Sequence, residues 1–248
     1  MKYRTDEFPP KASTSTRLGV RMRSQLADTY KARGNSTGKI WHQYSAKARR
    51  DVAFATEIDY LHFLYVESSF DVIHVDYTPE LKVQRAVGRS FVEYVNAEIL
   101  MANGVVVWRH VCAANKTESA RSRQSQLQIL IQSCDMPDGA PNPRVEILTH
   151  EDMLAAPQRI RNWHSVAAWL AAGRDWALTE EQLEVAALIR SKKRVEFQEV
   201  LGLGKGTDQD DLYGVAIFRS MQAGAYSSNL FDVPFSMRTF FSEKSGSV

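Results

Sequence analysis

Hydrophobic and polar positions follow first a helical and then a strand-like period between residues 54 and 77. Residues 54–68 carry an apolar stripe at helical spacing, formed by Ile58, Leu61, Phe63, Leu64 and Tyr65. In residues 71–77 every second position is apolar, so one side of a strand would carry Ile73, Val75 and Tyr77. The pattern therefore predicts a helix followed directly by a strand.

Two further strands are predicted over residues 91–100 and 105–111. Residues 101–104 separate them and end in Asn-Gly, a pair typical of hairpin turns. On the first strand, Asn96 and Glu98 share a face because alternate residues of a strand point the same way. The segment therefore predicts an antiparallel hairpin with a polar face.

The chain returns to a helical period over residues 117–134 and to a short strand over 145–149. A strand, a helix and a strand in that order imply a parallel crossover packed on a mixed sheet. Residues 51–152 are thus predicted to form an α/β domain of the restriction-endonuclease-like kind, with flanking helices.

A second, helical domain is predicted over residues 153–248. Three helices are expected at 157–176, 179–193 and 207–224, with a short helix before the last of them. An apolar-aromatic tail, interrupted by Pro234, suggests a hairpin or extended wing. Three helices and a terminal wing describe a winged-helix domain.

The last predicted helix begins with three aspartates, Asp208, Asp210 and Asp211. Their charges offset the unpaired N–H groups of the first turn and would repel DNA phosphates. Docking of a protein is therefore favoured over binding in a DNA groove.

Charge is distributed unevenly along the chain. The net charge is +2, but residues 1–50 hold twelve basic and three acidic residues, a net charge of +9, which leaves −7 for the remainder. A basic arm of residues 1–50, partly flexible, predicts a polyanionic partner such as double-stranded DNA. The candidate DNA contacts at the end of the arm are Lys39, Lys47, Arg49 and Arg50. The neighbouring Trp41 and Tyr44 would either grip nucleic acid or pin the arm to the core.

Other classes of protein are not supported. Two cysteines are too few for a disulfide framework or an all-thiolate zinc site, and no apolar run is long enough to span a membrane. The histidines form no HExxH unit, and the glycine-rich stretch 202–207 lacks the spacing of a phosphate loop. A cytoplasmic protein is expected.

Three residues are the candidates for catalysis: Glu57, Glu98 and His110. Glu57 lies on the predicted helix, where an acid facing the sheet could help to hold Mg²⁺, and Asp59 is an alternative. Glu98 would be the second metal ligand, and His110 could act as a base or a ligand. No carboxylate occurs among Trp108 to Val111 on the next strand, so this set would make a weak cage for Mg²⁺.

The stretches SAKARRDVAFATEIDYLHFLYVESSFDVIHVDYTPELKV and YVNAEILMANGVVVWRHV resemble the TnsA-like endonuclease subunit of heteromeric transposases. The likeness extends over roughly residues 38–242 and includes the C-terminal winged helix. Glu57 matches the helix acid of that family. The strand aspartate falls on Ala97, between Asn96 and Glu98. The acid-x-lysine motif falls on Trp108 to His110 or one residue later, and does not match.

The resemblance implies a bacterial, nucleoid-associated protein that cuts the non-transferred strands at transposon ends. Such a subunit works beside a transposase subunit and docks an AAA+ ATPase regulator through its winged helix. The unmatched positions predict a degenerate nuclease site that would still contact transposon-end DNA. Two alternatives stay open: an active Mg²⁺-dependent endonuclease, and a stand-alone DNA-binding regulator.

Overall fold

The computed structural model describes residues 39–77, 80–83, 91–113, 116–132, 142–206 and 210–244. The predicted arm up to residue 38 lies outside this range, as do residue 207, where the last helix is expected to begin, and Asp208. The described residues divide into two units. The first takes in residues up to 42, 47–62 and 72–152, and the second takes in 43–46, 63–71 and 153–248.

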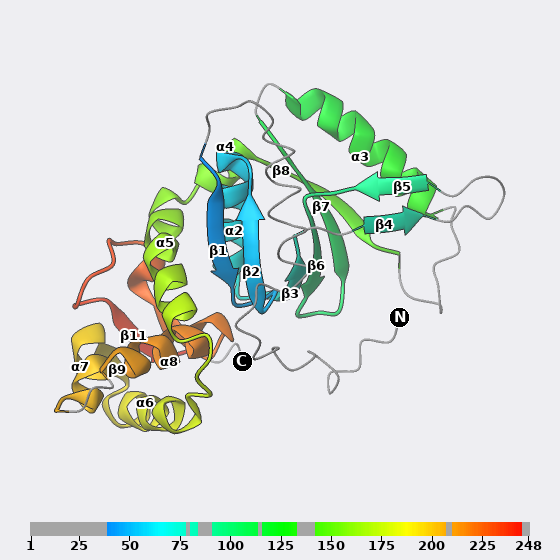
Figure 1. Cartoon of the computed structure of the whole chain (residues 1–248). Helices are drawn as coiled ribbons and strands as arrows, with labels where there is room; N and C mark the ends of the chain where they lie inside the picture. The colour runs from blue at the N-terminus through cyan, green and yellow to red at the C-terminus, as the bar shows by residue number, and fades with distance from the viewer. Residues whose placement is uncertain are drawn as a thin grey trace. The chain divides into compact units, whose positions relative to one another are not determined.

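A four-stranded mixed sheet with the order β3-β6-β7-β8 forms the centre of the first unit (Figure 1). Its strands are β3 (Val72–Asp76), β6 (Ala97–Met101), β7 (Val106–Cys112) and β8 (Arg144–Thr149). The first three are antiparallel neighbours, and β8 runs parallel to β7. The chain is thus a mixed α/β protein, and the predicted mixed sheet is confirmed.

Helix α3 (Thr117–Gln132) makes the parallel crossover between β7 and β8, as the sequence predicts. Its Leu127 and Ile131 pack on Trp108 and Val145, which face the same side of the sheet. Residues that point to the other side of the sheet, such as Ala97, are also fully buried, so both faces of the sheet are covered. The apolar spacing of α3 therefore selects its core-facing side.

The hairpin between β6 and β7 is confirmed. Gly104 adopts a φ of 80°, a region that glycine enters without steric cost, and its N–H donates to the carbonyl of Met101 at 2.9 Å. The long strand predicted before the turn is instead two strands. β5 (Phe91–Tyr94) pairs with β4 (Glu80–Val83) in a separate ribbon, and β6 begins only at Ala97.

The predicted orientation of Ile73 is wrong. Its side chain is 58% exposed, whereas Val72 and Val75 are buried. The pairing of β3 with β6 shifts between Val72 and His74, and such a bulge turns one residue out of the alternation. Strict period-two reasoning therefore failed at the edge strand of the sheet.

Helix α2 (Glu57–Glu67) begins three residues later than predicted, because Phe54 ends strand β2 (Arg50–Phe54). β2 pairs with β1 (Trp41–Ser45), a strand within the segment assigned to the basic arm. Trp41 stacks on Tyr60 of α2 at 4.3 Å with an interplanar angle of 3°. Of the two roles open to this aromatic residue, the stack favours pinning the chain to the core.

Besides the second half of α2, the described residues of the second unit contain five helices and a three-stranded sheet. They are α4 (His150–Leu154, shared with the first unit), α5 (Pro157–Ala172), α6 (Thr179–Lys192), α7 (Phe197–Leu201) and α8 (Asp210–Gln222). The sheet has the order β10-β11-β9, with β9 (Arg194–Glu196), β10 (Tyr226–Ser228) and β11 (Phe240–Glu243), all antiparallel. The second unit also has two short 3₁₀ turns, Gly202–Gly204 and Asn229–Phe231. The predicted terminal hairpin is present as β10 and β11.

Helix α8 is the core of the second unit. Every residue from Tyr213 to Phe218 is buried, so its middle is covered on all sides. Gly214 lies against the ring of Trp169 on α5, where a Cβ would come within 2.5 Å of a ring carbon. In the described part of the chain, no helix is long and apolar enough to cross a membrane.

Candidate nuclease-like corner

The candidate site is the corner where α2 begins, β6 begins and β7 ends. Asn96 connects the three elements. Its side-chain Nδ2 donates to Asp59 Oδ1 at 2.9 Å, and its Oδ1 accepts from the backbone N–H of Val111 at 2.8 Å. Because the Val111 N–H can only donate, it fixes the orientation of the amide and forces Nδ2 toward Asp59.

The structure brings Asp59, the alternative acid, to this corner. Its Oδ2 accepts from the hydroxyl of Thr56 at 2.5 Å, and its backbone N–H donates to the same hydroxyl at 3.2 Å. Thr56 thus stabilises the first turn of α2, and both carboxylate oxygens of Asp59 are engaged. Glu57, the predicted helix acid, is exposed and makes no side-chain hydrogen bond or ion pair to any described residue.

Asn96 and Glu98 were expected to share a strand face, but β6 begins at Ala97, so Asn96 precedes the strand. Glu98 has a different partner. Its Oε2 accepts from the indole N–H of Trp108 at 2.9 Å, directly across the pairing of β6 with β7. Burial raises the pKa of Glu98, as does the charge of Asp76 across β3, while the Trp108 hydrogen bond lowers it. Among the described residues, Glu98 and Glu57, the other predicted metal ligand, do not belong to a common group of side chains that could hold a metal ion.

The opposite face of β7 carries a buried cation. Arg109 is 7% exposed, and its Nη2 bonds to Glu146 on β8 at 2.8 Å. His62 of α2 is fully buried near it, and burial together with the Arg109 charge lowers the pKa of His62 to about 3. This histidine is therefore neutral at physiological pH. His110, the predicted base, is half-buried and pairs in register with Ile147.

Mg²⁺, which the resemblance implies for an active enzyme, does not fit this corner. The position facing the Asp59 carboxylate is taken by an amide N–H donor, and the oxygen of the same amide points to a backbone N–H. A hard cation needs several oxygens directed at one point. Among the described residues, no group of three or more His, Cys, Asp or Glu side chains could hold a metal ion.

The four predicted DNA contacts lie in different environments. Lys39 and Arg49 are exposed. Lys47 is 4% exposed and donates to the carbonyl of Val72 at 2.9 Å, which favours a structural role over phosphate contact. Arg50 forms an ion pair with Asp76. Only two of the four therefore present their charge to solvent.

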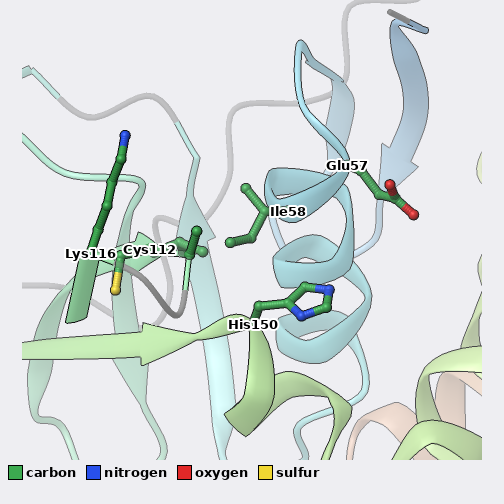
Figure 2. A pocket seen from close by; sticks show the side chains of 7 residues that line it. Glu57, Ile58, Cys112, Lys116 and His150 are labelled. Carbon is green, nitrogen blue, oxygen red and sulfur yellow. The ribbon is translucent and has the colours of Figure 1, made fainter.

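A pocket of about 460 Å³ opens beside the corner (Figure 2). Its walls are formed by the first residues of α2, the end of β7, the approach to α3 and the residue that follows β8. The lining residues are Glu57, Ile58, Val111, Cys112, Ala113, Lys116 and His150. Of these, only Glu57 had been predicted as functional.

A general rule could have drawn attention to Lys116 and His150 in the sequence. Each follows a strand, 106–112 or 144–149, and the two strands are parallel neighbours in the sheet. Ligands of such sheets bind beyond the carboxyl ends of the strands. The signal is positional, and no motif surrounds either residue.

No known protein-family profile matches this sequence, and no match to it is found among curated proteins.

Proposed function

We propose that this protein is a TnsA-like subunit of a DNA transposition machinery, with a restriction-endonuclease-like core whose nuclease site is degenerate. In this role it contacts transposon-end DNA and docks a transposase subunit and an AAA+ ATPase regulator. Such a protein would act in the bacterial cytoplasm, at the nucleoid.

The order of elements in the first unit supports the proposal. An acid-bearing helix, α2, is followed by strand β3, the β6–β7 hairpin, helix α3 and the parallel strand β8. This is the layout that the family resemblance implies for the core. It also places Asp59 of the helix beside the start of β6, where a nuclease of this kind has its acidic residues.

Asn96 supports the degenerate-site part of the proposal. The amide faces the helix carboxylate with a hydrogen-bond donor, so the corner is electrostatically satisfied without a cation. The strand that should carry acid-x-lysine holds Trp108 and Arg109 instead, and both are buried in contacts with other protein groups. The fold is compatible with a nuclease ancestor, and the side chains favour a binding subunit.

The second unit supports docking to a protein. Its order, α6, β9, α7, α8, β10 and β11 with a β10-β11-β9 sheet, is compatible with a winged helix. The third helix of that arrangement, α8, is buried against α5 and has little surface left for a DNA groove. Trp176 and Leu183 are 57% and 64% exposed, and exposed apolar side chains of this size suit a protein partner.

Binding and cleavage of DNA test the proposal together. Fluorescein-labelled duplex and supercoiled plasmid would be incubated with wild-type protein and with Glu57→Ala and Asp59→Ala, in Mg²⁺ or Mn²⁺. We expect salt-dependent binding of duplex by all three proteins and no nicking above a no-protein control. The candidate transposase would be added in a second series, with complex formation followed by size-exclusion chromatography.

Two results would contradict the proposal in different ways. Nicking by the wild type that is lost in either variant would show an active endonuclease, the first alternative. Tight, sequence-selective binding by the protein alone, without a complex with the transposase, would favour the stand-alone regulator.

A further inference from the structure

The pocket beside the nuclease-like corner has features of a binding site that the corner itself lacks. It lies where the parallel strands β7 and β8 reach their carboxyl ends, which is the ligand-binding edge of an open α/β sheet. Its volume of about 460 Å³ is within the range of small-ligand sites. Cys112 ends β7 and His150 directly follows β8, so the pocket is built on rigid elements.

The polar side chains around this pocket are not used to stabilise the fold. Over the residues that the structure describes, Glu57, Lys116 and His150 form no side-chain hydrogen bond or ion pair. By contrast, Asp59 and Asn96 of the neighbouring corner are engaged in hydrogen bonds. Available donors and charges around a pocket are what a ligand site requires, whereas satisfied ones belong to the scaffold.

The electrostatics of the pocket favour an anion. Two helices begin at its walls, α2 at Glu57 and α3 at Thr117, and the first N–H groups of a helix carry partial positive charge. Lys116 adds a full positive charge immediately before α3. Figure 2 shows the Glu57 side chain directed away from Lys116, with Ile58 between them, so the two do not neutralise each other directly.

A metal ion is a weaker candidate for this pocket. Glu57, Cys112 and His150 have the right chemistry, but no three such side chains in the described ranges converge closely enough to hold an ion. A cation would also be repelled by Lys116. The geometry therefore suits a group that accepts hydrogen bonds and carries negative charge.

We infer that this pocket binds a phosphate group, with Lys116 as its ion-pair partner and His150 as a hydrogen-bond donor. The inference rests on the proposed function, in which the phosphate belongs to the DNA backbone at a transposon end. Lys116 then supplies, from the segment after β7, an exposed positive charge, whereas Arg109 on β7 is buried in its ion pair with Glu146. The pocket would position DNA at the corner without any chemistry on it.

Duplex binding by the full-length chain tests the role of Lys116. Fluorescence anisotropy of a labelled duplex would be measured over a range of salt concentrations for wild type, Lys116→Ala, Lys116→Arg and Lys205→Ala. Lys116→Ala should bind more weakly, and the slope of log K against log salt should fall by about one unit, since one phosphate contact is lost. Lys116→Arg keeps the charge. Lys205 is exposed in the second unit and serves as a control of equal charge.

Cys112 reports on occupancy of the pocket directly. In a Cys134→Ser background it is the single thiol, and its rate of reaction with N-ethylmaleimide would be measured alone, with duplex and with inorganic phosphate. We expect duplex to slow the reaction in this background and to slow it less when Lys116→Ala is added. Complete reaction in denaturant confirms that the thiol is intact.

The outcomes separate this inference from the proposed function. Duplex binding that is unchanged by Lys116→Ala and leaves Cys112 reactive would overturn the phosphate pocket, while the proposed DNA-binding role stands. Absence of duplex binding by the wild type would contradict the proposed function. In that case protection of Cys112 by inorganic phosphate, abolished by Lys116→Ala, would still support the pocket, and no protection would overturn it.

Discussion

At the scale of single residues, the orientation of one amide decides what the nuclease-like corner can do. Val111 donates its backbone N–H to Asn96, so the amide must present its own N–H₂ group to Asp59. A carboxylate at position 96 would present an oxygen instead. With Asn96, the polar groups of the corner are paired with one another, whereas a carboxylate at this position would call for a cation.

Asn96→Asp should therefore destabilise the protein near neutral pH, by about 1–3 kcal/mol, because two carboxylates then face each other and one hydrogen bond is lost. The loss should be smaller at acidic pH, because a proton on the introduced carboxyl group relieves the repulsion. Millimolar Mg²⁺ should stabilise this variant and leave the wild type unchanged, since only the variant directs oxygens at one point. Urea unfolding measures each effect.

Asn96→Ala is the control for this experiment, because it removes the amide without adding charge. Its stability should be insensitive to Mg²⁺ and should lack the added pH dependence. Equal unfolding free energies for Asn96→Asp and wild type at neutral pH would show that the amide is not the group that neutralises the corner.

A second residue-scale prediction concerns Glu98, whose pKa is raised chiefly by burial. Between the ordinary glutamate pKa of 4.5 and the raised pKa of folded Glu98, the folded state holds more protons than the unfolded state. Stability must then fall as the pH rises through that window. Glu98→Gln keeps an acceptor for Trp108 and carries no charge, so chemical unfolding between about pH 4 and pH 8 should show a smaller decline for this variant.

At the scale of elements, the close approach of α5 and α8 organises the second unit. Gly173 and Gly214 lie at the contact, where added Cβ atoms would meet Val215 and Trp169 respectively. The Trp169 ring cannot retreat easily, since Phe197 and Phe218 pack around it. The absence of side chains at these two positions is what allows the helices to approach.

Gly214→Ala should consequently lower the free energy of unfolding, although alanine favours helix by about 1 kcal/mol. The Cβ would lie 2.5 Å from a Trp169 ring carbon, and overpacking of a core typically costs about 1–3 kcal/mol. Gly202→Ala is the matched control, because nothing lies within 4 Å of its added Cβ. Thermal unfolding of the pair should show a lower midpoint for Gly214→Ala alone.

At the scale of the whole molecule, the charge asymmetry of the chain bears on the proposed binding of DNA. The first 50 residues carry a net charge of +9, and the remainder carries −7. Of the four basic candidates in the described part of that segment, Lys47 and Arg50 are bonded within the protein. Within the first 50 residues, the proposed DNA contact would therefore depend mainly on the basic residues before position 39.

Replacing Arg17, Arg21 and Arg23 by glutamine in the full-length chain should weaken duplex binding. The salt slope should fall by up to about three units, because each phosphate contact contributes about 0.9. The matched control replaces Arg190, Lys193 and Arg194 of the second unit, which removes the same charge. A larger loss of affinity in the control would indicate that DNA contacts the second unit rather than the arm.

The sequence by itself determined the elements whose periodicity is strong and local. They are the helix predicted at 54–68 and found at 57–67, the hairpin turn at 101–104, the crossover through α3 and the helices of the second unit, which follow from apolar spacing and turn chemistry. Hydrogen bonds within a helix or a hairpin connect residues near in the chain, so local pattern suffices to predict them.

Only the tertiary structure decided which polar side chains meet. The bulge that exposes Ile73, the partnership of Asp59 rather than Glu57 with Asn96, and the burial of Lys47 each depend on residues far apart in the chain. The pocket around Lys116 depends on where two strands end in space. Such contacts arise when packing of the elements sets distances between side chains, and periodicity along one segment carries no information about them.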